Sequence, residues 1–114
     1  MGNIYNLDYL KEISGDDTFI KDMISTFVKD APQYYYKLKR HFIHRNYAGM
    51  EDVIHKFKNA ATYIGNNQLL KELSDLDENI SGSKNTLKIR SNIIQIDLLV
   101  HDIITKLKTD FNIL

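Results

Sequence analysis

The stretch that decides the fold spans residues 50–65 and reads Met50-Glu51-Asp52-Val53-Ile54-His55-Lys56-Phe57-Lys58-Asn59-Ala60-Ala61-Thr62-Tyr63-Ile64-Gly65. Its apolar residues recur every three or four positions, which is typical of an amphipathic helix that buries one stripe. They are Met50, Val53, Ile54, Phe57, Ala61 and Ile64. At about 100° per residue, His55 falls roughly opposite the centre of this stripe, and Lys58, Asn59 and Thr62 fall within about 60° of it. We therefore expect His55 and Lys58 to share one exposed face.

Helical patterns also cover the rest of the chain, which has one proline and five glycines to mark the boundaries. We expect a short helix over residues 7–13 and a long helix that follows a cap at Asp16 or Asp17 and continues to about residue 42. A third helix should begin after Asn46 and end at Gly65, a fourth should span residues 67–80, and a fifth residues 85–110. Pro32 should kink or divide the second helix.

Four long helices with short connections predict an all-α fold, an antiparallel up-down four-helix bundle with a short additional N-terminal helix. We expect one domain over residues 1–114. The isoleucine-rich run over residues 89–96 is the weakest part of this prediction, because β-branched side chains lower helix propensity.

Composition excludes several classes of function. The 15 basic and 15 acidic residues balance, whereas a nucleic-acid-binding protein usually has a clustered basic excess. The absence of cysteine excludes disulfides and thiolate metal sites and fits a reducing compartment. No apolar run approaches about 18 residues and no signal-peptide pattern begins the chain, so we expect a cytoplasmic protein without membrane insertion.

His55 is the residue whose chemistry is most informative. Imidazole is a nitrogen nucleophile near neutral pH and forms covalent intermediates, and phosphorylation would add dense negative charge to it. The Lys58 ammonium, on the next turn of the helix, can offset that charge. The small side chains of Ala60 and Ala61 leave room for another protein to bring a carboxylate close. The pattern thus predicts a phosphoryl acceptor.

These residues also resemble a known family. The run His55-Lys56-Phe57-Lys58-Asn59-Ala60, followed by Gly65, is similar to the His-x-Leu-Lys-Gly-Ser signature of histidine-containing phosphotransfer (HPt) domains. Residues 7–13 and 16–20 resemble the amino-terminal part of that family, and Leu69 and Leu76 fit its next helix. Phe57 replaces leucine and Ala60 replaces serine. Asn59 stands where the family has glycine, and its side chain narrows the approach to His55.

The resemblance implies a phosphorelay intermediate, in which His55 accepts a phosphoryl group from the aspartate of one receiver domain and passes it to another. Lys58 would stabilise the phosphoryl charge, Lys56, Asn59 and Thr62 would contribute to partner docking, and Gly65 would be structural. The implied partners are a response-regulator receiver domain and a hybrid sensor histidine kinase, and the implied state is a monomer. No cofactor is expected on this chain, because the resemblance puts the Mg²⁺ on the receiver. The sequence contains no glycine-rich phosphate loop, so we expect a phosphocarrier rather than an enzyme with its own nucleotide site.

Three other functions compete with phosphotransfer, and the residues around His55 argue against one of them. A silent helical docking module, which binds receivers or other proteins without transfer, is favoured by Asn59. The dimerisation helix of a sensor kinase has an acidic residue directly after its histidine and a proline a few residues later, whereas Lys56 and Phe57 follow here. A small metal-binding or ligand-binding bundle ranks last, because it would need polar residues inside the core and the predicted stripes are almost entirely apolar. His41 and His44 could face one metal, but they are only two ligands and lie among basic residues. The run Tyr34-Tyr35-Tyr36 should pack one or two rings and leave the third at the surface.

Overall fold

The computed structural model describes residues 4–113, and all of its regular structure over that range is helical. Five helices follow one another along the chain: α1 (Asp8–Ile13), α2 (Asp17–Ile43), α3 (Tyr47–Ile64), α4 (Asn67–Ser81) and α5 (Thr86–Phe111). Each lies within two residues of the range that the apolar spacing predicts. The all-α class is therefore confirmed.

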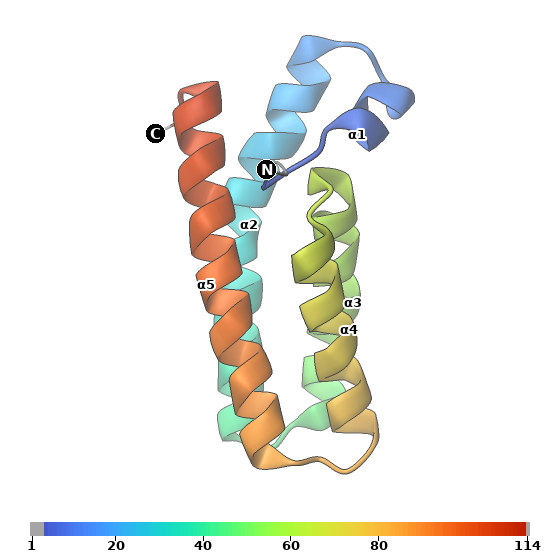
Figure 1. The fold of residues 1–114 in the computed structure, drawn as a ribbon, viewed down its shortest axis with the longest axis vertical. Coiled ribbons are helices and arrows are strands. Elements are labelled where there is room, and N and C mark those ends of the chain that lie inside the picture. The colour runs from blue at the N-terminus through green and yellow to red at the C-terminus, as the bar shows by residue number, and fades with distance from the viewer. Residues whose placement is uncertain (1–3, 114) are drawn as a thin grey trace.

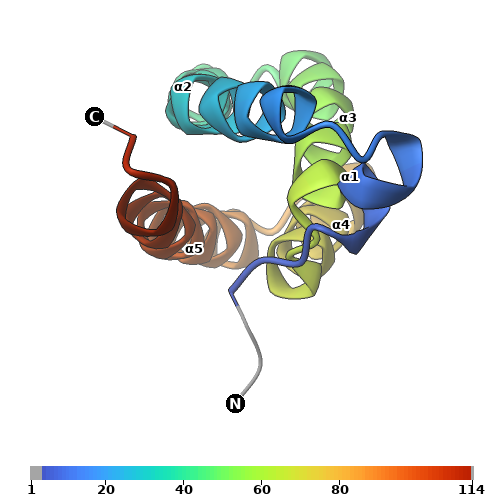
Figure 2. The same ribbon diagram turned by 90° about the horizontal axis from the view of Figure 1, so that it is seen from above.

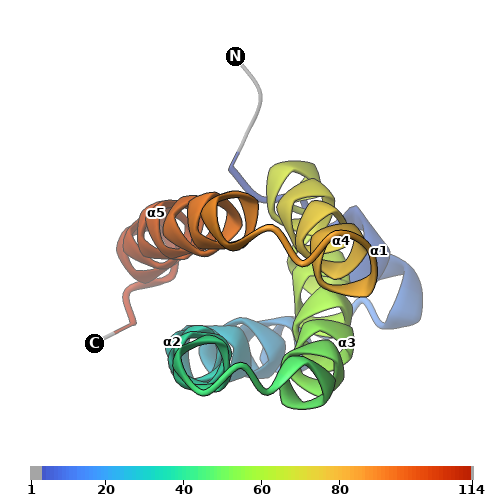
Figure 3. The same ribbon diagram turned by 90° about the horizontal axis from the view of Figure 1, so that it is seen from below.

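The four longer helices lie side by side along the long axis of the molecule (Figure 1). Seen from either end, α2, α3, α4 and α5 occupy the four corners in chain order (Figures 2 and 3). The contacts agree, since α2 packs against α3 and α5, and α4 packs against α3 and α5. The short α1 contacts α3 near the end at which α3 finishes. The buried apolar residues of these helices form one cluster.

Polar caps begin the four longer helices. The side chains of Asp16, Asn46, Asn66 and Asn85 accept a hydrogen bond from a backbone N–H in the first turn of α2, α3, α4 and α5. Such caps satisfy donors that have no partner within the helix. The predicted caps of α2 and α3 are confirmed. Asn66 was missed, because a run of two asparagines offers two possible starts for α4.

Pro32 does not divide α2, which continues from Asp17 to Ile43. A proline removes one backbone donor and crowds the preceding turn, but burial holds the helix together on both sides of it. Phe27 and Ala31 before the proline and Leu38 and Phe42 after it are all buried. The upper turns of α2 lean away from its lower part, so the helix bends without breaking (Figure 1).

The isoleucine-rich run of α5 is helical, despite its low propensity, because it packs against α4 and α2. Ile89, Ile93 and Ile96 face the core, whereas Leu87 and Ile94 are 74% and 52% exposed. The adjacent Ile93 and Ile94 differ in burial because residue 94 lies about 100° round the helix from residue 93.

A buried polar layer joins α4 to α5. Asn92 is 7% exposed, and its Nδ2 donates a 2.7 Å hydrogen bond to Glu72 Oε1. Asn79 Nδ2 donates in turn to Asn92 Oδ1, also at 2.7 Å. Because a buried amide without partners is costly, this layer favours one register of α4 against α5.

The amino-terminal segment ties the ends of two helices together. The Asn6 N–H donates to the Ile64 carbonyl at 2.8 Å, and the Tyr5 hydroxyl donates to Asp110 Oδ2 at 2.6 Å. Burial, followed by the hydrogen bond to Asp110 and its negative charge, raises the pKa of Tyr5 to about 12. The hydrogen bond from Tyr5 is the main cause that lowers the pKa of Asp110, and Lys106 adds to it. This segment therefore fastens the last turn of α3 to the last turn of α5.

Within residues 4–113, none of the helices combines the length and the apolar character needed to cross a membrane.

Candidate functional site

The helix α3 is fixed at both ends, which determines where its side chains point. Asn46 Oδ1 accepts a 2.9 Å hydrogen bond from the Gly49 N–H at the start. At the end, Gly65 has a left-handed conformation with φ of 69°, and its N–H bonds to the carbonyls of Ala61 and Thr62. A side chain at Gly65 would also meet the backbone oxygen of Asn6. The prediction that Gly65 ends this helix is thus confirmed, and the close approach of Asn6 explains why glycine is needed.

One face of α3 is buried and holds it against its neighbours. All six residues of the predicted stripe are core residues, from Met50 to Ile64, and Phe57 is 0% exposed. The ring of Tyr34 on α2 packs against Phe57 at a centroid distance of 5.3 Å. Tyr34 and Tyr35 are partly buried and Tyr36 is 70% exposed, as the sequence predicts. The opposite face of α3 must therefore point to solvent.

His55 lies on that outer face and is exposed. Lys56, Asn59 and Thr62 are exposed as well. Lys56 forms an ion pair with Asp52 one turn earlier, at 3.4 Å, in which both side chains are well exposed. The Thr62 hydroxyl donates a 2.9 Å hydrogen bond to the carbonyl of Lys58, so this donor is directed to its own helix.

Lys58 departs from the expectation of a shared exposed face, because it is only partly exposed. Its ammonium lies 3.7 Å from Asp77 Oδ2 on α4, and the two side chains are 28% and 27% exposed. The other carboxylate oxygen, Asp77 Oδ1, is buried without a hydrogen-bond partner. Lys58 thus leans from α3 towards α4 while its backbone stays one turn from His55.

Asp77 was not singled out from the sequence, although a signal for it exists. It follows Leu76 and lies four residues after Leu73, both of which are buried. A carboxylate at that spacing falls at the edge of the buried stripe of α4, where it can reach a cation on a neighbouring helix. The sequence does not reveal that this neighbour is α3.

A small hollow lies beside the outer face of α3, between it and α2. Its volume is about 260 Å³, and it is mainly apolar. Met23, Phe27 and Tyr34 line it from α2, and Asn59, Ala60 and Tyr63 line it from α3, together with polar groups at its rim. The sequence predicted the small side chains on α3 but not the hollow, because the hollow is formed by residues of both α2 and α3.

The histidines on the other helices are not part of this face. His41 is partly buried at the end of α2, whereas His44 and His101 are exposed. His101 is exposed because it lies on the solvent side of α5. Over residues 4–113, no three His, Cys, Asp or Glu side chains gather in a way that would hold a metal ion.

Comparison with protein-family models, with curated proteins and with solved structures finds no match to this chain.

Proposed function

We propose that this chain is a histidine phosphotransfer protein of a two-component phosphorelay, with His55 as the phosphoacceptor. The observation that carries the proposal is the position of His55: an exposed imidazole on a helix whose opposite face is held in the core, one turn from a lysine. The likeness of residues 55–65 to the HPt signature supports it. The proposal includes an antiparallel up-down four-helix bundle as a single domain over residues 1–114.

The proposed reaction needs little chemistry from the chain itself. The unprotonated ring nitrogen of His55 attacks the phosphorus of an aspartyl phosphate on a receiver domain. An N–P bond forms, the P–O bond to the aspartate breaks, and the aspartate leaves as a carboxylate. The phosphorylated ring releases the proton of its other nitrogen to solvent. It takes a proton back when the carboxylate of a second receiver attacks the phosphorus, the N–P bond breaks and the phosphoryl group passes to that receiver. Such transfers depend on in-line positioning and charge neutralisation, and Mg²⁺ on the receiver would supply part of the second.

Lys58 would supply the rest of the neutralisation. Its ion pair with Asp77 is long, at 3.7 Å, and leaves one Asp77 oxygen without a partner. A partly exposed pair of this kind contributes little to stability. A phosphoryl group on His55 carries up to two negative charges and would compete with Asp77 for the ammonium. Asp77 would therefore hold Lys58 in the free protein and release it on phosphorylation.

The hollow beside α3 would help a receiver to dock. Its apolar lining from Met23, Phe27 and Tyr63 can accept an apolar side chain of the partner, while Lys56 and Asn59 at its rim can make polar contacts. Partially apolar pockets with polar rims are typical of protein interfaces. Lys56, Asn59 and Thr62 are the residues to which we assign docking.

The test is phosphate transfer from a phosphorylated receiver domain. We expect acid-labile, base-stable phosphate on the wild-type chain and none on His55→Gln. His101→Gln is the matched control, because His101 is also an exposed helical histidine but lies on α5. Loss of label in His55→Gln with retention in His101→Gln supports the proposal. Label that survives His55→Gln would overturn it.

A second candidate is a docking module that binds receivers without transfer. Asn59 favours it, because its exposed side chain lies one turn beyond His55, at the rim of the hollow. Binding of a phosphorylated receiver without label on the chain, for both wild type and Asn59→Gly, would identify this second function.

A further inference from the structure

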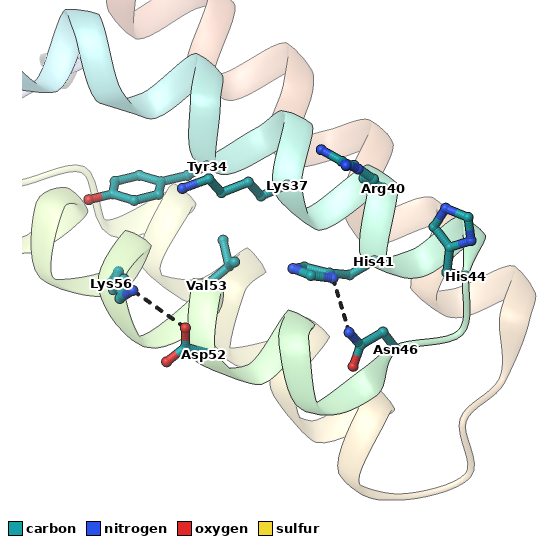
Figure 4. Close-up of a pocket in the computed structure, with 9 residues that line it drawn as sticks. All are labelled: Tyr34, Lys37, Arg40, His41, His44, Asn46, Asp52, Val53 and Lys56. Atoms are coloured by element: carbon teal, nitrogen blue, oxygen red, sulfur yellow. Dashed lines mark hydrogen bonds and ion pairs between the residues drawn. The ribbon is translucent and has the colours of Figure 1, made fainter.

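A second and larger cleft lies between the last turns of α2 and the first turns of α3, with a volume of about 560 Å³ (Figure 4). His55 is not among the residues that line it. The charged and histidine side chains that line it are Lys37, Arg40, His41, His44, Asp52 and Lys56.

The cleft concentrates positive charge in a chain that is neutral overall. Lys37 and Arg40 line it from α2, where the Lys37 side chain extends towards Tyr34, and Lys56 lines it from α3 (Figure 4). The single carboxylate of the lining, Asp52, lies 3.4 Å from the Lys56 ammonium. Three permanent cations thus face one anion, although the whole chain has 15 of each. Cations on two walls suit a ligand with more than one anionic group, because each group can contact the cations of one wall.

His41 presents a hydrogen-bond donor to the same space. Asn46 Oδ1 is already engaged, since it accepts from the Gly49 N–H at 2.9 Å. The amide Nδ2 of Asn46 therefore faces His41 Nδ1, at 3.3 Å, and an amide NH₂ can only donate. Nδ1 of His41 must accept, so the ring proton lies on Nε2. Nε2 points away from Asn46 into the cleft (Figure 4).

Gly49 makes this arrangement possible. A Cβ at residue 49 would lie 2.6 Å from His41 Nδ1 and 2.8 Å from Asn46 Nδ2. The absence of a side chain lets His41 lie directly over the first turn of α3. That turn carries the positive end of the helix dipole, which adds to the potential of the lysines and the arginine.

We propose that this cleft binds a small polyanion with at least two phosphoryl groups, of the pyrophosphate type. Arg40 would bind one phosphoryl group through its planar fork of donors, and Lys37 would neutralise it. Lys56 would bind the other group from α3, and the Nε2–H of His41 would donate between them. This site does not depend on phosphotransfer at His55, although it shares Lys56 with the proposed docking residues. Lys56, which borders both the cleft and the apolar hollow, would link a bound anion to the docking face.

The test is a titration of the isotope-labelled chain with pyrophosphate at constant ionic strength, followed by the backbone amide resonances. We expect saturable shifts that centre on residues 37–41 and 46–56. The variant Lys37→Gln/Arg40→Gln should bind at least about tenfold more weakly, because it loses two charge-assisted contacts. The variant Lys88→Gln/Arg90→Gln removes the same charge from exposed positions on α5 and should bind as the wild type does. Thermal unfolding of both variants checks that each is folded.

Three results would overturn the proposal. The first is that the shifts never saturate, or that both double variants lose affinity equally. Either result indicates only nonspecific electrostatic attraction. The second is equal affinity for orthophosphate and pyrophosphate, which indicates an adventitious ion only. The third is saturable binding of an acidic peptide but not of pyrophosphate, which identifies a protein-docking surface instead. The His41 ring gives an independent check, because a ring nitrogen spectrum should show the proton on Nε2, and a proton on Nδ1 would contradict the geometry.

Discussion

The two faces of α3 differ in almost every physical respect, although they belong to the same 18 residues. The inner face consists of six apolar side chains, all buried, and it contacts both α2 and α4. The outer face carries His55, Asn59 and Thr62, which are exposed and have no part in the core. The inner face thus fixes the position of the helix, and the outer face is free to carry chemistry. Substitutions on the two faces should therefore have separable effects on folding and on phosphotransfer.

The largest effect is expected on the inner face. Phe57→Ala should lower the free energy of unfolding by about 3–5 kcal/mol, because it removes a fully buried ring and leaves a cavity. Thr62→Ala, on the outer face, should change it by no more than about 0.5 kcal/mol. Urea unfolding followed by circular dichroism measures both. Similar losses in the two variants would break the distinction between the faces.

The next effect concerns access to His55. Asn59→Gly should speed transfer from a phosphorylated receiver by about tenfold, which corresponds to about 1.4 kcal/mol in the barrier. Its cost in stability should stay below about 0.5 kcal/mol, since asparagine is itself a poor helix former. Asn59→Ala should give an intermediate rate. Rates that do not change in either variant would show that Asn59 does not obstruct the histidine.

A smaller effect is expected at the boundary between the faces, where Lys58 leans towards α4. Asp77→Asn removes the competing charge and should slow the hydrolysis of phosphorylated His55 by about two- to fivefold. This factor corresponds to an ion pair worth roughly 0.5–1 kcal/mol. The neighbouring Asp75→Asn makes the same change of charge on α4 and should leave the rate unaltered. Equal effects of the two variants would point to net charge rather than to the Lys58–Asp77 contact.

The smallest effect concerns the segment that fastens the end of α3. The hydrogen bond from Tyr5 lowers the pKa of Asp110. The ionised carboxylate therefore stabilises the fold above the pKa of an unfolded aspartate, about 3.9, and this contribution is lost as the pH falls through the lower folded value. The raised pKa of Tyr5 has the opposite dependence, with a contribution present below about 10 that is lost as the pH rises through about 12.

Tyr5→Phe should therefore be less stable than the wild type at neutral pH, and the difference should shrink below about pH 4. Urea unfolding at the two pH values measures this. Tyr36→Phe, at a side chain that is 70% exposed, should show no such difference. If the loss of stability in Tyr5→Phe stays the same at low pH, the hydrogen bond to Asp110 is not its cause.

The fold was largely predictable because its helices are amphipathic and their ends carry strong signals. Asn46 caps the start of α3 and Gly65 ends it, as their chemistry requires. The three- and four-residue spacing identified the buried face of this helix. The sequence was less informative where packing decides the outcome. It left open whether Pro32 kinks or divides its helix, which is continuous, and it did not separate the exposed Ile94 from the buried Ile93. Periodicity alone does not decide which of several adjacent isoleucines faces the core.

The candidate site was predictable only within α3. The exposure of His55 and its spacing to Lys58 follow from the helix geometry of one segment. The partner of Lys58 on α4, the hollow shared with α2 and the basic cleft at His41 each require two helices at a known distance. Residues far apart in the sequence, such as Lys58 and Asp77, meet there only through the tertiary fold.

The most direct test of this account measures folding and phosphorylation on the same His55→Gln protein. We expect its free energy of unfolding to lie within about 0.5 kcal/mol of the wild type, because His55 makes no part of the core. We also expect its intact mass to stay unchanged after incubation with a phosphorylated receiver that adds one phosphoryl group to the wild type. A folded His55→Gln chain that still gains the phosphoryl group would contradict the account.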